Sequence, residues 1–251
     1  MGAYTGAVTP LRKHGQFATT RWSMVLAAGG DMTSTDARAA LTVLCDAYWY
    51  PLYAFLRSRG HSAADAEDVT QAFFARLLEK HTLRYADRER GRFRSFLLTS
   101  LTHFAANEHD KDAAQKRGSG VPALSLEFEN AEGRFQLEPA TDETPEKVFD
   151  RRWALALLDR VLSRLRAEMA ADGNARQFEH LKTYLVGDLP RVSYGDAAGA
   201  LGVSEGAVKV AVHRLRRRYR DLVRDEIMQT VSSPAEVEDE LRHLLASVST
   251  R

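Results

Sequence analysis

The sequence predicts an all-α protein with two helical domains, a four-helix domain and a helix-turn-helix domain, joined by a flexible acidic linker. Apolar residues recur at helical spacing in most segments, whereas few segments alternate with period two. The helical pattern fails from residue 113 to about residue 145, where glycines and prolines interrupt it. We expect five segments: an N-terminal extension (1–16), the first helical domain (17–112), the linker (113–145), the helix-turn-helix domain (146–226) and an amphipathic C-terminal tail (227–251).

Composition narrows the class of protein. With 251 residues, of which 44% are apolar and 27% charged, the chain resembles an ordinary soluble globular protein. It has no run of 18 apolar residues and no apolar stretch typical of a secretory signal near its start, so we expect a cytoplasmic protein without a membrane segment. Its single cysteine, Cys45, excludes internal disulfides and cysteine-based zinc sites, and we assign it to the core. No metal and no cofactor are predicted.

Four helices are expected in the first domain. A short helix lies between residues 19 and 29, and a longer one follows over residues 34–59, with Pro51 expected to kink or split it. Ser62 is placed to cap the third helix, whose first turn is acidic as the helix dipole favours. The fourth helix covers residues 92–112 and carries phenylalanines and leucines on its inner side. Helices of this length can share one core.

The most informative segment of the chain is a helix-turn-helix. A short apolar helix, Tyr194–Leu201, is closed by Gly202, and Ser204 can cap the next helix because its hydroxyl accepts a free backbone N–H. Steps of four and three residues then place a core stripe along this second helix: Val208, Val212, Leu215, Tyr219 and Leu222. Between Glu205 and Asp225, seven lysines and arginines stand against three acidic residues, so the free face is basic. This pattern is typical of a DNA-recognition helix.

Helical periodicity also surrounds this motif. Upstream it appears over residues 146–169 and 178–186, and downstream over residues 234–248. The last segment is expected to form a short amphipathic tail helix.

Three segments together resemble bacterial sigma factors of the sigma-70 type, in particular the compact extracytoplasmic-function (ECF) group with two structured domains. These segments are Asp65–Leu78 (DAEDVTQAFFARLL), the aromatic helix that starts at Phe93, and Val203–Arg218. The resemblance implies that the first domain is sigma-2-like and the second sigma-4-like. It also implies that the protein binds core RNA polymerase, directs promoter-specific transcription initiation at −10 and −35 elements, and aids promoter melting.

The acidic helix is the polymerase-binding segment by this resemblance. In the family it docks on a basic coiled coil of the β′ subunit, and the β subunit is a further expected contact. Carboxylates packed against arginines would make this contact sensitive to salt. Simple complementation of the helix dipole accounts for the same acids and stays open. The residues expected to dock are Asp65, Glu67, Asp68 and Gln71.

Negative charge suggests two further hypotheses. Ala72 stands where relatives often carry an acid, so phosphorylation of the neighbouring Thr70 could supply the missing charge. A Ser/Thr kinase is therefore left open as a partner, and the sequence separately leaves open whether an anti-sigma factor binds the chain. Residues 121–150 carry two basic and eight acidic side chains, a net charge of −6. The linker would then occupy basic nucleic-acid channels of the polymerase, or else serve as a solvated tether.

Promoter DNA is expected to meet two helices. The resemblance implies that residues of the fourth helix read and open the −10 element: Arg92, Arg94, His103, Asn107 and Lys111. Phenylalanines of this helix are assigned to the core rather than to base stacking. In the recognition helix, the residues expected nearest the bases are Ser204, Glu205, Lys209 and His213, and those nearer the phosphates are Arg214, Arg217 and Arg218. Val210 and Ala211 stand where many relatives have a serine and an arginine, so one phosphate contact is expected to be missing.

Other functions account for less of the sequence. A regulator that binds DNA by itself through residues 190–225, with a sensor or dimerisation domain in front, is the main alternative. An adaptor that holds polymerase without reading DNA would leave the basic face unexplained. An enzyme is not predicted, because the chain has no phosphate-cradling glycine loop, no G-x-S-x-G and no H-E-x-x-H.

Overall fold

The computed structural model describes residues 35–79, 92–112, 131–136, 143–185, 192–231 and 233–249. Within these ranges the chain is almost wholly helical, apart from turns and one isolated antiparallel bridge between Arg92 and Val231. The all-α prediction is confirmed. The helix expected between residues 19 and 29 and most of the predicted linker lie outside the described ranges. Among the helices that are described, none has the length and apolarity to cross a bilayer.

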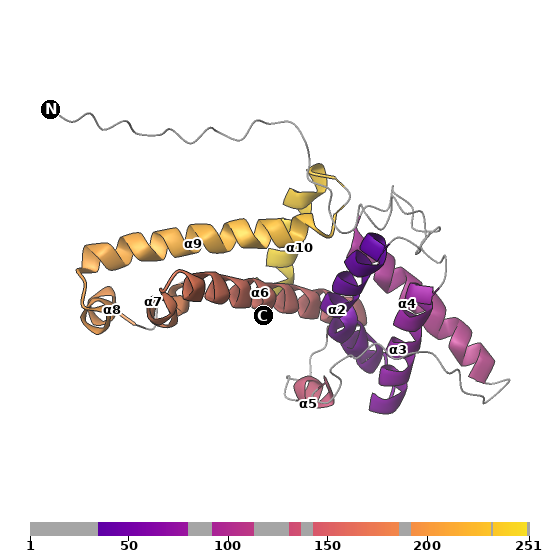
Figure 1. Cartoon of the computed structure of the whole chain (residues 1–251). Coiled ribbons are helices and arrows are strands. Elements are labelled where there is room, and N and C mark those ends of the chain that lie inside the picture. The colour runs from indigo at the N-terminus through magenta and orange to yellow at the C-terminus, as the bar shows by residue number, and fades with distance from the viewer. Residues whose placement is uncertain are drawn as a thin grey trace.

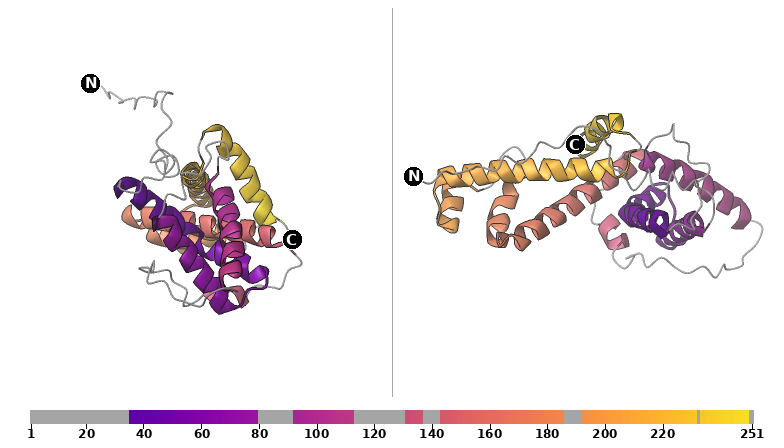
Figure 2. Two further views of the ribbon diagram at one scale, coloured as in Figure 1. Left: turned by 90° about the vertical axis from the view of Figure 1, so that its right-hand side faces the viewer. Right: turned by 45° about the horizontal axis from the view of Figure 1, so that its top comes forward.

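Helices are arranged as a bundle at one end and a long pair of helices leading away from it (Figure 1). The right-hand view of Figure 2 shows the same elongated arrangement, and the left-hand view looks at it from the end that carries the bundle. α2, α3 and α4 form the bundle, α6 and α9 lie side by side, and α7 and α8 lie at the far end. The elements are α2 (Thr35–Ser58), α3 (Ala63–Glu79), α4 (Phe93–Asp112), α5 (Ala131–Gln136), α6 (Pro145–Ala171), α7 (Ala175–Leu181), the 3-10 turn η4 (Lys182–Tyr184), α8 (Tyr194–Leu201), α9 (Glu205–Met228) and α10 (Ala235–Ser249).

The turn between α2 and α3 follows the sequence signals. Pro51 lies inside α2, which continues as one helix on both sides of it. Gly60 takes a positive φ of 93°, a conformation that favours glycine, and ends the helix as predicted. The Ser62 hydroxyl accepts a hydrogen bond from the backbone N–H of Asp65 at 3.1 Å and donates one to the Asp65 carboxylate at 2.7 Å. Ser62 therefore caps α3.

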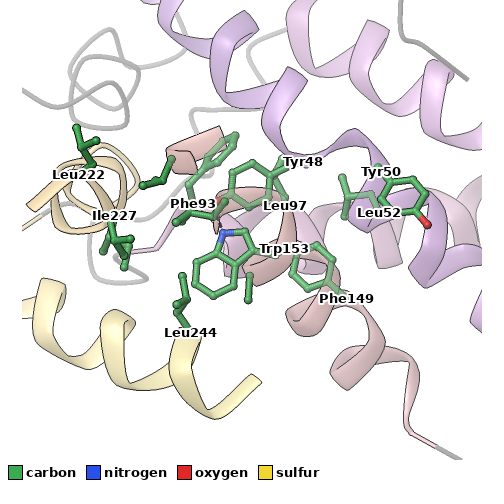
Figure 3. Packing of buried hydrophobic residues seen from close by; sticks show 14 of the residues in the cluster. Tyr48, Tyr50, Leu52, Phe93, Leu97, Phe149, Trp153, Leu222, Ile227 and Leu244 are labelled. Carbon is green, nitrogen blue, oxygen red and sulfur yellow. Dashed lines mark hydrogen bonds between the residues drawn. The ribbon is translucent and has the colours of Figure 1, made fainter. Parts of the chain in front are cut away.

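Buried side chains along the whole of α6 belong to one continuous hydrophobic core. Trp153 is fully buried, and its indole N–H donates to the Tyr48 hydroxyl of α2 at 2.9 Å. Figure 3 shows the Trp153 ring between Phe93 of α4 and Leu244 of α10, with Tyr48 of α2 nearby. Farther along α6, Val161 and Leu165 join the same buried cluster as the inner residues of α9. The cluster thus continues across residue 146, where we predicted that the second domain begins.

One helix was not expected. α5 lies within the predicted linker and is held against α2 by hydrogen bonds to the Glu132 carboxylate, 2.8 and 2.9 Å from Arg57 and 2.6 Å from the Tyr53 hydroxyl. Phe135 adds its ring, whose centroid is 5.1 Å from the Arg57 guanidinium. Hydrogen bonds from Arg57, and then from Tyr53, lower the pKa of Glu132 to about 2 although partial burial opposes the shift. Residues 131–136 are thus a docked helix and not irregular linker.

Candidate nucleic-acid interface

The predicted helix-turn-helix is present as α8, a tight turn and α9. Ser193 caps α8, with its hydroxyl 3.1 Å from the backbone nitrogen of Asp196. Gly202 takes a positive φ of 70° in the turn, and the Ser204 hydroxyl accepts the backbone N–H of Ala207 at 3.2 Å to cap α9. Ala197 is buried where α8 packs on α9, and its small side chain suits a close approach.

α9 divides into an inner and an outer face. Val208, Val212, Leu215 and Leu222 are 4% exposed or less, as the sequence stripe predicts. The outer face carries the predicted DNA-binding residues, all of which are exposed: Ser204, Glu205, Lys209, His213, Arg214, Arg217 and Arg218. The helix therefore presents these side chains to solvent along about 20 Å, since each residue adds ~1.5 Å.

These cations differ in what they already bind. Arg218 makes two hydrogen bonds of 2.8 Å to the Glu168 carboxylate of α6. Lys209 lies 2.7 Å from the Glu205 carboxylate, and the hydrogen bond and charge of Glu205 raise the pKa of this lysine. Arg214 and Arg217 make no hydrogen bond or ion pair with any residue that the structure describes. These two guanidinium groups are thus ready to bind phosphate without breaking an internal pair.

Two arginines of α9 were not among the predicted site residues. Arg216 donates to the backbone carbonyl of Tyr184 at 2.9 Å and ties α9 to the turn after α7. Arg220 is exposed, three residues after Arg217, and has no ion pair within the described ranges. Helical spacing places it beside Arg217, so the sequence contained the signal that Arg220 belongs to the same basic face.

The acidic residues of α3 lie on its outer side. Asp65 and Asp68 are exposed, and Glu67 is half-buried. Gln71 donates from its side-chain amide to the Glu67 carboxylate at 3.3 Å, so it belongs to the same surface. Asp65 also takes part in the helix cap described above, which supports the dipole explanation for this one residue.

Thr70 does not belong to that surface. It is 0% exposed, and its hydroxyl donates to the backbone carbonyl of Ala66 at 2.6 Å. Its side chain lies in the buried stripe with Ala66, Phe73 and Leu77. A kinase cannot reach this hydroxyl in the folded protein, and a phosphate there would be buried among the apolar side chains just named. The structure thus corrects the phosphorylation hypothesis.

α4 separates the predicted −10 residues into two groups. His103 and Asn107 are both exposed and lie one turn apart on the same face. The side chain of Lys111, farther along, lies outside what the structure describes. Phe93 is fully buried and Phe104 is 8% exposed, so these rings belong to the core as predicted.

Arg92 and Arg94 form the second group, at the other end of α4. Arg94 is 9% exposed and donates to the carboxylates of Glu240 at 2.6 Å and Asp150 at 2.8 Å, while its guanidinium lies 5.2 Å from the centre of the Trp153 ring. Arg92 lies 3.2 Å from Glu240, which is itself 1% exposed. The structure therefore engages both arginines with α6 and α10 and does not bring them together with His103 and Asn107.

Burial and ion pairing shift the pKa of Arg94 in opposite directions. Burial by itself lowers the pKa of the guanidinium, but the hydrogen bonds and charge of Glu240 and the charge of Asp150 outweigh it, so the net shift is upward. Arg94 therefore stays charged at every accessible pH. We name Arg92, Arg94, Asp150 and Glu240 the junction cluster, because they join α4, α6 and α10.

Two comparisons with known proteins found matches to this chain. Residues 45–114, which span most of α2 and all of α3 and α4, match the family described as Sigma-70 region 2. This part of the chain therefore resembles region 2 of the sigma-70 family. The chain is also 25% identical over 170 residues to the ECF RNA polymerase sigma factor SigE of Mycolicibacterium smegmatis, an alignment that covers 67% of this chain and 56% of that relative. The predicted resemblance to the ECF group is confirmed.

The extent of these matches is limited in two ways. The aligned part of the chain spans little more than half the length of the curated relative. No solved structure gives a significant match to the chain.

Proposed function

We propose that this protein is a sigma factor, which binds core RNA polymerase and directs promoter-specific transcription initiation. The observation that carries the proposal is the outer face of α9, whose exposed guanidinium groups project from a capped helix-turn-helix in a chain that also contains a sigma-70 region 2. A basic helix of this kind suits the major groove, and a region 2 domain supplies the second contact that a sigma factor needs.

Core polymerase would bind the outer side of α3. Asp65 and Asp68 offer exposed carboxylates there, and Gln71 adds an amide next to Glu67. Arginines on the β′ subunit would pair with these groups, so the affinity for core polymerase should fall as salt rises. A contact with the β subunit belongs to the same proposal.

Promoter DNA would contact both halves of the chain. His103 and Asn107 of α4 would contact bases of the −10 element and aid its melting, with Lys111 near the strand backbone. The first turns of α9 would enter the major groove at the −35 element, with Arg214 and Arg217 on phosphates. Arg92 and Arg94 are left out of this interface because carboxylates of the junction cluster neutralise them.

Transcription of a randomised promoter library by core polymerase, with and without the full chain, tests the proposal. We expect start sites that appear only when the chain is present and that share two upstream elements. A gel-shift assay on the selected promoters separates the alternatives, because a sigma factor needs core polymerase for tight binding, whereas a stand-alone regulator shifts DNA unaided. Tight binding without polymerase, together with unchanged start sites, would contradict the proposal.

A further inference from the structure

The outer face of α9 is not uniformly polar. Val210 is 52% exposed, although it stands two residues from buried Val208 on one side and two from buried Val212 on the other. Steps of two residues turn a helix by about 200°, so Val210 points away from the core. Its neighbours on this face are the exposed His213 and Arg214. An apolar side chain thus lies in the middle of the predicted DNA-reading surface.

Gly206 lies one helical turn before Val210 on the same face. Its φ is not positive, and a Cβ atom added to it would meet nothing closer than the Ser204 hydroxyl at 3.9 Å. Neither backbone conformation nor internal packing therefore requires glycine here. Glycine and valine are both weaker helix formers than alanine, so the fold gains nothing from either residue at these exposed positions.

We propose that Val210 reads the C5-methyl group of a thymine in the −35 element, and that Gly206 provides the clearance for this contact. Thymine presents a methyl group in the major groove at the place where cytosine has only a hydrogen, and apolar side chains recognise it by contact. The inference rests on the proposed function and adds to it a base preference at one position.

The position of Val210 in α9 fits this role. It is the sixth residue of a helix that begins at Glu205, and recognition helices contact base edges through their N-terminal turns. His213 and Arg214 follow at once and can bind acceptors on neighbouring bases or phosphates. A helix residue without a side chain, one turn earlier, lets the backbone approach the edges of the bases closely. Val210 would then discriminate between bases while the surrounding cations supply affinity.

The test replaces each thymine of the selected −35 element in turn by deoxyuridine, which lacks only the methyl group. Affinity is measured for core polymerase carrying the full chain. We expect one position at which deoxyuridine weakens binding about fourfold, as for the loss of one buried methyl group. In Val210→Ala the affinity for the thymine promoter falls by a similar factor, and the difference between thymine and deoxyuridine at that position disappears.

A matched control is Val43→Ala. Val43 is a 46% exposed valine in α2, away from the recognition helix, and this variant should keep the full difference between the two bases. Indifference of the unmodified protein to deoxyuridine at every position overturns the inference, as does a difference that persists in Val210→Ala. Failure of the library to yield any upstream element overturns the proposed function as well, so the two failures are distinguishable.

The variant Gly206→Ala tests separately whether the missing side chain at this position lets α9 approach the bases closely. The added methyl group meets open space within the protein and favours the helix, so the thermal stability of the variant should equal or exceed that of the parent. We expect its promoter affinity to fall severalfold with both thymine and deoxyuridine. Promoter affinity equal to that of the parent would overturn the role of Gly206.

Discussion

Arginines at the junction cluster and arginines on the outer face of α9 show how one side chain serves two purposes. Arg94 is 9% exposed and hydrogen-bonds to two carboxylates, one from α6 and one from α10. Arg217 is exposed and has no ion pair within the described ranges. The first is neutralised within the fold, whereas the second can still bind an external anion.

The solvent exposure of an arginine determines how much it contributes to the stability of the fold. A buried guanidinium depends on its carboxylates, because removing one partner leaves a charge that water cannot reach. An exposed guanidinium is hydrated, so the fold gains little from it and loses little without it. Substitution in the junction cluster should therefore lower stability, and substitution on the outer face of α9 should lower DNA affinity.

Glu240→Ala should have the largest effect on stability. Among the described residues, the variant leaves the buried Arg94 with Asp150 as its one remaining carboxylate partner, and it removes the carboxylate that Arg92 also contacts. We expect the free energy of unfolding to fall by about 3 kcal/mol, within the range for breaking a buried pair. Urea denaturation followed by circular dichroism measures it.

A neighbouring glutamate provides the control. Glu238 belongs to the same helix but is exposed and pairs with the exposed Arg224. Glu238→Ala should cost less than about 1 kcal/mol. Equal losses in the two variants would show that burial of Glu240 does not set its contribution.

Arg217→Ala tests the other side of the comparison. We expect promoter affinity, measured with core polymerase present, to fall about tenfold, which corresponds to one charge-assisted hydrogen bond to phosphate. The slope of log affinity against log salt should become shallower by about one. The free energy of unfolding should stay the same because Arg217 has no partner within the described ranges. Loss of stability without loss of affinity would reverse the assignment.

The ion pair between Glu132 and Arg57 lies between these two extremes, because both of its side chains are partly exposed. The pKa of Glu132 is about 2 in the fold against a usual 4.5, mainly because of hydrogen bonds from Arg57. A carboxyl whose pKa is lowered on folding stabilises the fold above its unfolded pKa, and this contribution is lost as the pH falls from about 4.5 toward 2.

Solvent screening reduces this contribution to about 1 kcal/mol at pH 7, since both side chains are partly exposed. Comparing the parent with Glu132→Gln by urea denaturation at several pH values should give a difference that shrinks steadily below pH 4.5. A difference that is the same at pH 7 and pH 4 would contradict the pairing.

The sequence predicted local features of the fold better than long-range ones. Helix ends at Gly60, Ser62, Gly202 and Ser204 follow from residues next to one another, and the structure has each of them. Burial of Thr70 was also predictable, because Ala66 and Phe73 mark its face of α3. The partners of Arg94 were not, because Glu240 is 146 positions away and only the packing of α10 brings it near.

α5 is a second feature that the sequence could not predict. Six residues are too few for a helical period to stand out, and this helix is held by contacts with α2 rather than by its own pattern. Within the candidate site, sequence spacing predicted the outer face of α9 but could not distinguish arginines already paired from those without an internal partner. That distinction depends on residues such as Glu168, which lies 50 positions before Arg218.

Arg218 is paired within the fold like Arg94 and exposed on α9 like Arg217. Its substitution should have the smallest overall effect of those considered. It lies on α9 beside Arg217, yet two hydrogen bonds hold it to Glu168, and both side chains of the pair are at least 32% exposed. Because an exposed pair contributes little, Arg218→Ala should lower the free energy of unfolding by about 0.5 kcal/mol. Its effect on promoter affinity should be smaller than that of Arg217→Ala, since Glu168 competes with phosphate for the same guanidinium. Glu168→Gln offers the decisive contrast: it weakens the internal pair while leaving Arg218 in place, so promoter affinity should rise if Arg218 is withheld from DNA. Unchanged affinity in this variant, together with a tenfold loss in Arg218→Ala, would mean that Arg218 binds phosphate despite its internal partner.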